Sequence, residues 1–391
     1  MFAIAALDEL ASGVPSSGAP DIERTLGLSH GGTTAILFLV PGLFGLVLDP
    51  VVFWLAERVG RPRMIRLGLA AHAVAAFAAA WAPGPVSLAG AMALWFVAAG
   101  AATGLSEAIL VDAWPDRQAR TMARWTLLSL IGDFAGPALV GVLATAIGGH
   151  AAWRPAFVVT GALFTVWTIA TCARAFPAPP ARADDDDEPP LWQAVRDALR
   201  DRVLIAWMFG TALCNLLDEI LVVFASLHVR DDLGAGPAWQ SVTIGAFVAG
   251  GALGLVALDR VLARWPGRER RALIATGAAC AVAFAAWLAA PTAWLSALGM
   301  VGVGVTAAPL YPLASAQAYA RRPGRASVVI VASNLFAPMS LALPWLLGLV
   351  ADHTSVTTAL WLLIAQPIGI LALAITTGDR GNRGSRTDGA P

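Results

Sequence analysis

Residues 55–66 read LAERVGRPRMIR and form a short island of charge between two apolar runs. The run before the island covers residues 33–56, and the run after it covers residues 64–82. Each run is close to the roughly 20 mostly apolar residues that a membrane helix needs, because lipid offers the backbone no other hydrogen-bond partner. The island therefore predicts a surface loop that joins two membrane-spanning helices.

The same alternation continues in both directions along the 391 residues. Hydrophobic residues make up 58% of the chain and charged residues 13%, whereas a soluble domain carries roughly 25% charged residues. The pattern predicts an all-α membrane protein with twelve transmembrane helices in two pseudo-symmetric six-helix bundles. We expect the helices near residues 2–18, 33–56, 64–82, 86–111, 121–147, 153–176, 203–227, 238–262, 271–290, 292–319, 326–350 and 355–377.

The arginines predict the orientation of these helices. All 26 basic residues are arginine, and 23 of them lie in the tail or in every second connecting segment. Such a bias is the positive-inside pattern of membrane proteins, and it predicts a multi-pass protein of a bacterial-type inner membrane with both termini in the cytoplasm. The first apolar run has no basic start and does not resemble a signal peptide, so either this helix is brief or the native chain begins upstream of Met1.

The chain divides into two halves with matching polar positions. We expect a first bundle at 1–176, a cytoplasmic linker at 177–202, a second bundle at 203–378 and a tail at 379–391. The linker combines an acidic run with a short amphipathic helix, which is typical of a segment lying on the membrane surface. Two acidic pairs occupy equivalent spans, and the segment around Asp133 aligns with the one around Asn334. This repetition predicts two related bundles around a central cavity.

Several classes of function lack their sequence signatures. The formal net charge is zero, so nothing suggests nucleic acid as a partner. The three cysteines have no C-x-x-C spacing, and there is no H-E-x-x-H or nucleotide-binding G-x-x-x-x-G-K-[ST] motif. At Asp133 the chain has Leu130 where the G-x-G-D motif of an intramembrane aspartyl protease has its first glycine. We therefore expect neither an enzyme nor a bound metal or cofactor.

The charged island resembles a loop signature of the major facilitator superfamily, G-x-L-A-D-R-x-G-R-[KR]-[KR]. The sequence has Phe53 for the first glycine, Glu57 for the aspartate and Pro62 for a base. The equivalent segment of the second half, from Asp259 to Arg268, has lost the spacing. The resemblance covers essentially the whole chain and implies a cytoplasmic gate element at Glu57, Arg58, Gly60 and Arg61.

A second resemblance lies in the fifth span. Residues 132–141 contain Gly132-x-x-x-Gly136-Pro137-x-x-x-Gly141, which is similar to the G-x-x-x-G-P-x-x-G-G element of drug:proton antiporters in this superfamily. Close helix packing alone explains the glycines, but it explains neither Pro137 nor Asp133 inside the motif. The arginine motif that many such exporters carry in the fourth span is absent around Glu107.

Carboxylates inside predicted spans are the strongest functional signal. Each ionised group at the centre of a bilayer costs roughly 2.5–3.5 kcal/mol, and no arginine lies deep in any predicted span. These acids must therefore face water, hold protons, or bind a cation that the protein does not supply. The candidate substrate or proton-coupling residues are Asp8, Glu9, Glu107, Asp133, Asn215, Asp218, Glu219, Tyr311 and Asn334.

Two other acids allow more than one interpretation. Asp49 precedes Pro50, so capping or stabilisation of a kink is as reasonable as ion binding. Asp112 lies near the end of the fourth span, where we expect a neutral acid or a salt bridge with Arg117 or Arg120.

These observations favour a secondary active transporter that works by alternating access. The expected activity is proton-coupled export of small lipophilic or cationic compounds. The alternative is a proton- or cation-coupled symporter that imports a small neutral or cationic metabolite. The expected partners are a small-molecule substrate, a coupling proton or Na⁺, and the lipid bilayer around a monomer.

Overall fold

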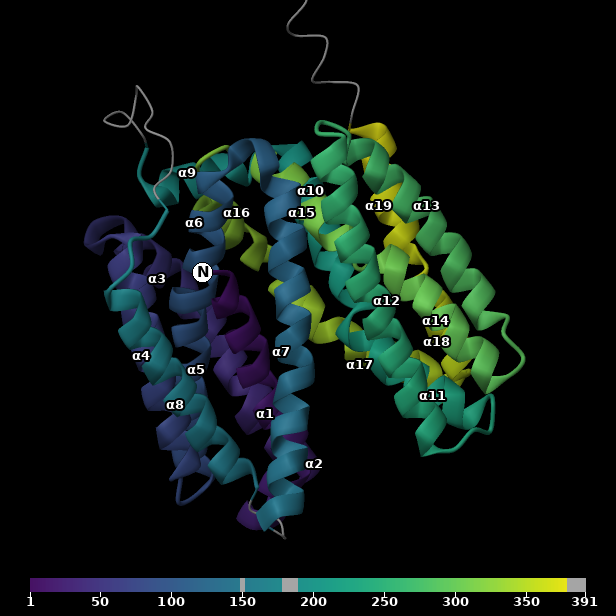
Figure 1. Cartoon of the computed structure of the whole chain (residues 1–391), viewed down its shortest axis with the longest axis horizontal. Helices are drawn as coiled ribbons and strands as arrows, with labels where there is room; N and C mark the ends of the chain where they lie inside the picture. The colour runs from purple at the N-terminus through teal and green to yellow at the C-terminus, as the bar shows by residue number, and fades with distance from the viewer. Residues whose placement is uncertain (148–151, 178–188, 378–391) are drawn as a thin grey trace, which may run out of the picture. The chain divides into compact units, whose positions relative to one another are not determined.

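The computed structural model describes residues 1–147, 152–177 and 189–377. The acidic run at 184–188 and the tail predicted at 379–391 lie outside these residues. Every regular element in the described part is a helix (Figure 1). Most are α-helices, while η1 and η2 are π-helices and η3, η5 and η6 are 3₁₀ turns.

The elements follow the predicted order along the chain. The first part contains α1 (Phe2–Leu26), α2 (His30–Thr34), η1 (Ala35–Leu39), α3 (Val40–Val59), α4 (Arg61–Ala80), α5 (Pro85–Ala99), η2 (Gly100–Gly104), α6 (Leu105–Ala113), η3 (Pro115–Arg117), α7 (Gln118–Ile147), α8 (Trp153–Cys172) and α9 (Leu191–Ala198). The second part contains α10 (Arg202–Cys214), η5 (Asn215–Leu217), α11 (Glu219–Asp231), α12 (Pro237–Arg264), α13 (Glu269–Leu288), α14 (Ala293–Ala307), α15 (Leu310–Ala320), α16 (Ala326–Ser333), η6 (Asn334–Phe336), α17 (Ala337–His353), α18 (Val356–Leu363) and α19 (Ala365–Thr376).

Within the described residues, nine helical stretches are long and apolar enough to cross a membrane. The three other predicted spans correspond to α1, to α10 with α11, and to α16 with α17. The first of these carries four acids and two internal prolines, and the other two are interrupted by a 3₁₀ turn. The polar content of α1, and the short helical pieces on either side of the 3₁₀ turns in the other two, explain why these spans are not among the nine.

The charged island forms the tight connection between α3 and α4. Gly60 adopts a φ of +96° there, a conformation that a residue with a Cβ rarely adopts. Pro62 lies in the first turn of α4, where the missing N–H leaves no helical hydrogen bond unmade. Gly60 is therefore the single residue between the end of α3 and the start of α4.

The chain forms two compact units. The first comprises Met1–Asp116, Trp125–Arg196 and Pro323–Val331, and the second comprises Arg117–Arg124, Asp197–Arg322 and Ala332–Pro391. Two short segments therefore belong to the opposite unit from the one that the sequence boundaries assign them to. The start of α7 belongs to the second unit, and the start of α16 belongs to the first.

One arginine in each unit occupies an equivalent place. In the first unit Arg66 of α4 donates to the backbone oxygens of Thr171 and Arg174 at the end of α8. In the second unit Arg270 of α13 donates to the backbone oxygens of Ala374 and Ile375 at the end of α19. A cation at a helix C-terminus satisfies carbonyls that lack an intrahelical partner. The shared device supports an internal repeat.

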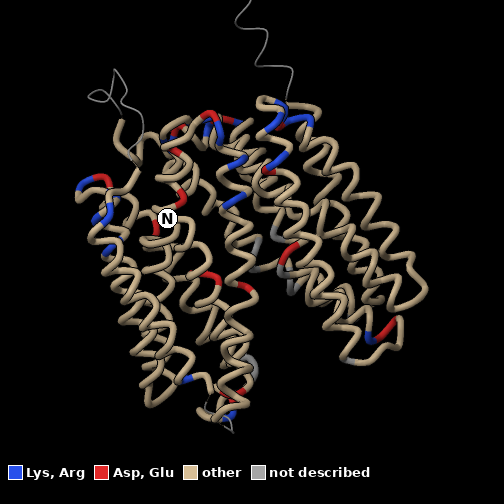
Figure 2. The backbone as a smooth tube through the Cα atoms, in the orientation of Figure 1, with Lys and Arg blue, Asp and Glu red and all other residues tan. Residues whose placement is uncertain are grey.

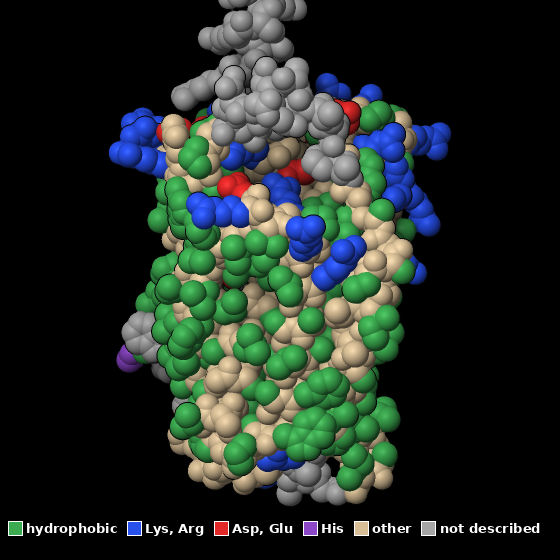
Figure 3. Space-filling model, turned by 90° about the vertical axis from the view of Figure 1, so that its left-hand side faces the viewer, with side chains coloured by type: hydrophobic (Ala, Val, Ile, Leu, Met, Phe, Trp, Pro, Cys, Tyr) green, Lys and Arg blue, Asp and Glu red, His purple; other side chains and the backbone are tan. Residues whose placement is uncertain are grey.

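Arginine positions concentrate at one end of each unit, while acidic positions also occur midway along the helices (Figure 2). The face in Figure 3 is largely hydrophobic through its middle, with arginines gathered toward its upper end. This surface fits a helical bundle that is surrounded by lipid between two polar regions.

Candidate functional site

Several of the predicted polar residues lie at or beside interruptions of three spans. The π-helix η2 separates α5 from α6, η5 separates α10 from α11, and η6 separates α16 from α17. Such interruptions leave backbone groups available for ligands, and π-bulges are frequent at functional sites. Each unit thus contains candidate polar residues near such interruptions, and we call the set within one unit its half-site.

The half-site of the second unit is built around Asp218. Its backbone leaves the helical region, with φ −115° and ψ −99°, and α11 begins at the next residue. Just before the break, the backbone N–H of Leu217 donates to Oε1 of Gln366 over 2.7 Å. Both residues are buried. A side chain from a distant part of the sequence therefore accepts a hydrogen bond from an N–H that the broken helix would leave unpaired.

Other predicted residues of this unit lie on neighbouring elements. The rings of Phe209 in α10 and Phe336 in η6 are 5.7 Å apart, so the second break packs against the helix that leads to the first. Asn334 opens η6 and is half-buried, and Tyr311 is half-buried in α15, which packs on α10. The side chains of Asn215 and Glu219 lie outside the described part of the structure.

The half-site of the first unit includes Asp8. Its carboxyl group in α1 interacts with the hydroxyl of Thr103 in η2. Neither Asp8 Oδ1 nor Thr103 Oγ1 has a hydrogen-bond partner, although both atoms are shielded from solvent. The carboxyl and the hydroxyl are therefore neighbours, and Oδ1 and Oγ1 form no hydrogen bond. The arrangement leaves a buried carboxyl oxygen available to a proton or another donor.

The glycines of the fifth span lie where α7 approaches α1 most closely. A Cβ at Gly132 would overlap the backbone oxygen of Ala6, and one at Gly136 would lie 2.6 Å from the oxygen of Leu10. Pro137 contacts Gly13 of α1 across the same interface. Both α7 glycines therefore act in helix packing.

The remaining residues of this unit surround that interface. Glu9 is half-buried and its Cβ lies beside Gly132, while Glu107 is half-buried in the first turn of α6. Asp133 is exposed, since the residue after Gly132 points about 100° away around the helix. Gly141 has open space where a Cβ would be, so it does not share the packing role of the other glycines.

The charged island is held by ion pairs within the first unit. Arg61 donates to Asp112 Oδ2 over 2.6 Å and to Ser327 Oγ over 2.6 Å. The other oxygen of Asp112 accepts the backbone N–H of Ala326 over 2.9 Å. The expectation that Asp112 pairs with Arg117 or Arg120 is therefore wrong. Arg61 approaches it from α4, whereas Arg120 has a different partner.

Two further contacts complete the island. Glu57 Oε1 lies 3.9 Å from a guanidinium nitrogen of Arg325, and Arg58 stacks over the ring of Trp54 at 3.8 Å. In the second unit Asp259 accepts hydrogen bonds from Arg120 over 2.6 Å and from Arg124 over 2.8 Å. Glu57 and Asp259 thus have arginine partners although the second loop lacks the motif spacing.

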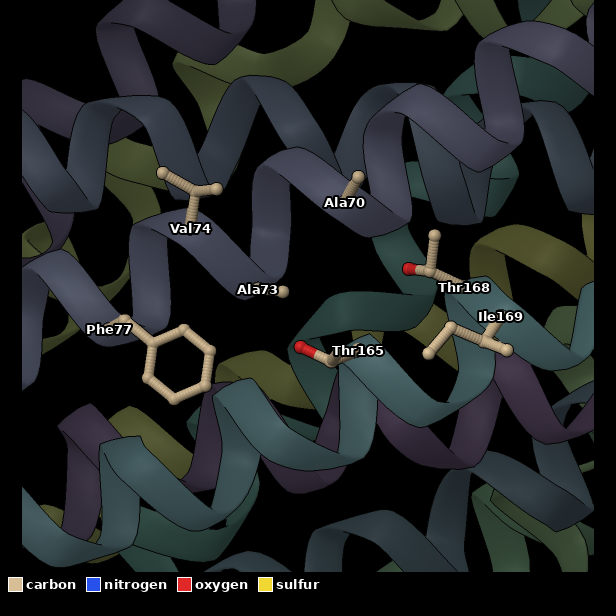
Figure 4. A pocket seen from close by; sticks show the side chains of 7 residues that line it. All are labelled: Ala70, Ala73, Val74, Phe77, Thr165, Thr168 and Ile169. Carbon is tan, nitrogen blue, oxygen red and sulfur yellow. The ribbon is translucent and has the colours of Figure 1, made fainter.

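A groove of about 200 Å³ lies between α4 and α8. Its lining is apolar except for two threonines, and those hydroxyls donate to Gly161 and Phe164 of their own helix. The side chains that form it are Ala70, Ala73, Val74, Phe77, Thr165, Thr168 and Ile169 (Figure 4). No polar group of the lining remains to orient a polar or charged ligand, so the groove suits an apolar chain.

Sequence analysis did not single out Gln366. The only signal was a polar residue within an apolar run, followed by Pro367. Among the described residues, no three His, Cys, Asp or Glu side chains gather to hold a metal ion. The chemistry available to the half-sites is therefore that of carboxyls, amides and hydroxyls.

Comparisons with known proteins agree with this architecture. The family model described as Major Facilitator Superfamily matches residues 1–343. No curated protein sequence matches the chain.

Solved structures with the same fold come from several transporters. The human organic anion transporter MFSD10 (TETRAN) is 16% identical with a TM-score of 0.70, and the match covers 95% of this chain and 97% of that one. The E. coli fucose:proton symporter FucP (N162A) is 10% identical with a TM-score of 0.70, covering 96% and 97%. The proton:xylose symporter XylE bound to 6-bromo-6-deoxy-D-glucose is 11% identical with a TM-score of 0.70, covering 95% and 93%. At these identities the similarity establishes the fold alone.

Proposed function

The chain belongs to the Major Facilitator Superfamily, and on that premise we propose that this secondary transporter exports small lipophilic or cationic compounds in exchange for protons. Superfamily membership also makes it a multi-pass membrane protein and not an enzyme. The proposal concerns its substrate, its coupling ion and the direction of transport.

One observation carries the proposal. Candidate carboxyls lie at or beside helix interruptions in both units, at Asp8 beside η2 and at Asp218 between η5 and α11. No arginine occurs in the apolar runs that contain them. A site for organic anions would need a fixed cation, whereas this one offers acceptors for protons and cations.

Asp8 is the favoured proton carrier of the first unit. An ionised carboxyl would be costly where Oδ1 is enclosed and has no hydrogen-bond donor. Binding a proton removes that cost, and access to water at another stage of the cycle would release it. This difference between two environments is what coupling requires, because a ligand shifts an equilibrium only by its differential affinity for two states.

Asp218 is the favoured contact for a cationic substrate. It is exposed, so a solute can reach it. It also directly precedes the N-terminus of α11, and a helix N-terminus favours negative charge. Glu219 would add a second negative charge at the same break. We expect a cation to interact here while protons use the more enclosed Asp8.

The export direction is supported by the resemblance of residues 132–141 to the drug:proton antiporter element. The orientation is supported by the arginine distribution, which favours cytoplasmic termini. Alternating access is the mechanism that we propose, with a monomer as the transporting unit. The ion pairs around Arg61 and Asp259 are candidates for contacts that break and re-form during the cycle.

The decisive test is proton flux in proteoliposomes that carry a pH-sensitive dye. We expect an imposed gradient of a lipophilic cation to drive protons in the opposite direction. Asp8→Asn should abolish the coupled proton flux, whereas the matched control Asp116→Asn, at an exposed loop position, should retain it.

The same assay separates the alternative functions. Proton movement in the same direction as the substrate would identify a symporter and refute antiport. Dependence on Na⁺ with no proton flux would refute proton coupling. Full coupled flux in Asp8→Asn would remove this residue from the proposed mechanism.

A further inference from the structure

A second carboxyl of the first unit meets the π-helix η2. Asp49 lies within α3, and its side chain packs directly on Gly100, the first residue of η2. A Cβ at Gly100 would overlap Asp49 Oδ1 and would lie 2.9 Å from Cγ. Only glycine leaves room for the carboxyl at this place.

The structure does not support capping or kink stabilisation by Asp49. Its Oδ1 is shielded from solvent and has no hydrogen-bond partner. A capping carboxylate would accept a backbone N–H, and a structural ion pair would place a guanidinium within reach. Oδ1 of Asp49 makes neither contact within the described residues.

Asp8 meets the same π-helix at a different residue. It interacts with Thr103, three residues after Gly100, and its Oδ1 is also enclosed without a partner. Carboxyls from α1 and α3 therefore both pack on a five-residue π-helix. Because a π-bulge is an irregular turn with a regular α-helical alternative, it can differ between states of the protein.

We propose that Asp49 is a second proton-binding group of the first unit and that η2 links its protonation to that of Asp8. The proposal rests on the proposed proton-coupled function and adds a second proton position to it. A proton on Asp49 allows the neutral acid to lie against the bare backbone of Gly100. Its loss leaves a carboxylate without a donor, and η2 or α3 must then move to bring in water or an N–H.

The surrounding elements carry other titratable groups, among them Glu9 on α1, His72 on α4 and Glu107 on α6. His72 is enclosed between Trp95 and Phe164, with its ring 4.3 Å and 4.1 Å from theirs. It therefore does not serve as the counter-charge of Asp49. Two of the arginines at the start of α4 have partners elsewhere, since Arg61 binds Asp112 and Arg66 binds the end of α8, and the third, Arg63, is exposed.

Infrared difference spectroscopy tests the proposal without any transport step. The absorption of protonated carboxylic acids is followed in the purified full chain as the pH is raised. We expect Asp49→Asn to remove one component of this band and Asp8→Asn to remove another and to shift the midpoint for Asp49. Asp116→Asn is the control and should leave both components. An Asp49→Asn spectrum identical to that of the wild type would overturn the proposal.

A second measurement tests the contact with η2. Gly100→Ala should shift the Asp49 component and lower the thermal midpoint, whereas Gly90→Ala should not, since Gly90 has open space around its Cβ position. Adding Asp49→Ala should relieve the effect of Gly100→Ala. Equal behaviour of the two glycine variants would refute the link through η2. If the carboxyl components appear but protons do not accompany transport, the proposed function fails while proton binding at Asp49 stands.

Discussion

The hydrogen bond between Leu217 and Gln366 offers a sharp test of how the interrupted seventh span is held. Gln366→Leu keeps most of the side-chain volume but removes the acceptor that lies 2.7 Å from the Leu217 nitrogen. Leaving a buried N–H unpaired costs about 1–3 kcal/mol. The change creates little cavity, so this polar term should dominate.

The assay is reversible unfolding of the purified protein in detergent, compared with binding of a lipophilic cation. We expect Gln366→Leu to lower the free energy of unfolding by about 1–3 kcal/mol and to weaken binding, because the break that positions Asp218 loses its support. Gln366→Glu, measured at a pH low enough to protonate the carboxyl, keeps a carbonyl acceptor and should recover most of the stability.

Gln193→Leu provides the control, since this glutamine is exposed on α9. A Gln366→Leu protein that is as stable as this control would contradict the reasoning. So would a Gln366→Glu protein that is as unstable as Gln366→Leu, because loss of the acceptor would not then be the cause.

Two further predictions concern packing and charge. Gly132→Val should destabilise the protein by at least about 1–3 kcal/mol, as overpacked sites do, because its side chain would overlap Ala6, whereas Gly141→Val should be close to neutral in the same unfolding assay. Asp201 is partly buried, which raises its pKa, but hydrogen bonds from Arg321 and from two N–H groups of α10 outweigh this effect and lower the pKa overall. Its stabilisation is therefore present above the usual aspartate range and lost as the pH falls through the lowered pKa, so the stability difference between wild type and Asp201→Asn should shrink in acid.

Much of the fold follows from local sequence. Each apolar run must form its own backbone hydrogen bonds in lipid, so length and hydropathy are enough to place a helix. All twelve predicted spans have helical counterparts among the described residues. The loop at Gly60 is equally local, because the positive φ requires a residue without a Cβ.

The helix interruptions depend on distant residues and could not be predicted in this way. The break before Asp218 is supported by Gln366, which lies 149 residues from Leu217 in sequence. The partner of Asp112 was predicted from nearby arginines, but the packing of α4 brings in Arg61. Sequence distance is a poor guide to ion pairs wherever helices from different parts of the chain meet.

The candidate site was partly accessible from sequence. The cost of charge in a bilayer identified Asp8 and Asp218, and the structure places both beside helix irregularities. The position of Asp49 against η2 depends on where α3 packs on the fourth span, which the sequence does not encode in any short motif.

The proposal that matters most is that the break before Asp218 in the second unit presents a negatively charged site for cations. Equilibrium binding of a matched series of cationic, neutral and anionic analogues, measured for the wild type, Asp218→Asn and Glu219→Gln, tests it most directly. We expect the wild type to prefer the cation, and we expect each substitution to weaken cation binding more than binding of the neutral analogue. Tight, saturable binding of the anion that neither substitution changes would contradict it.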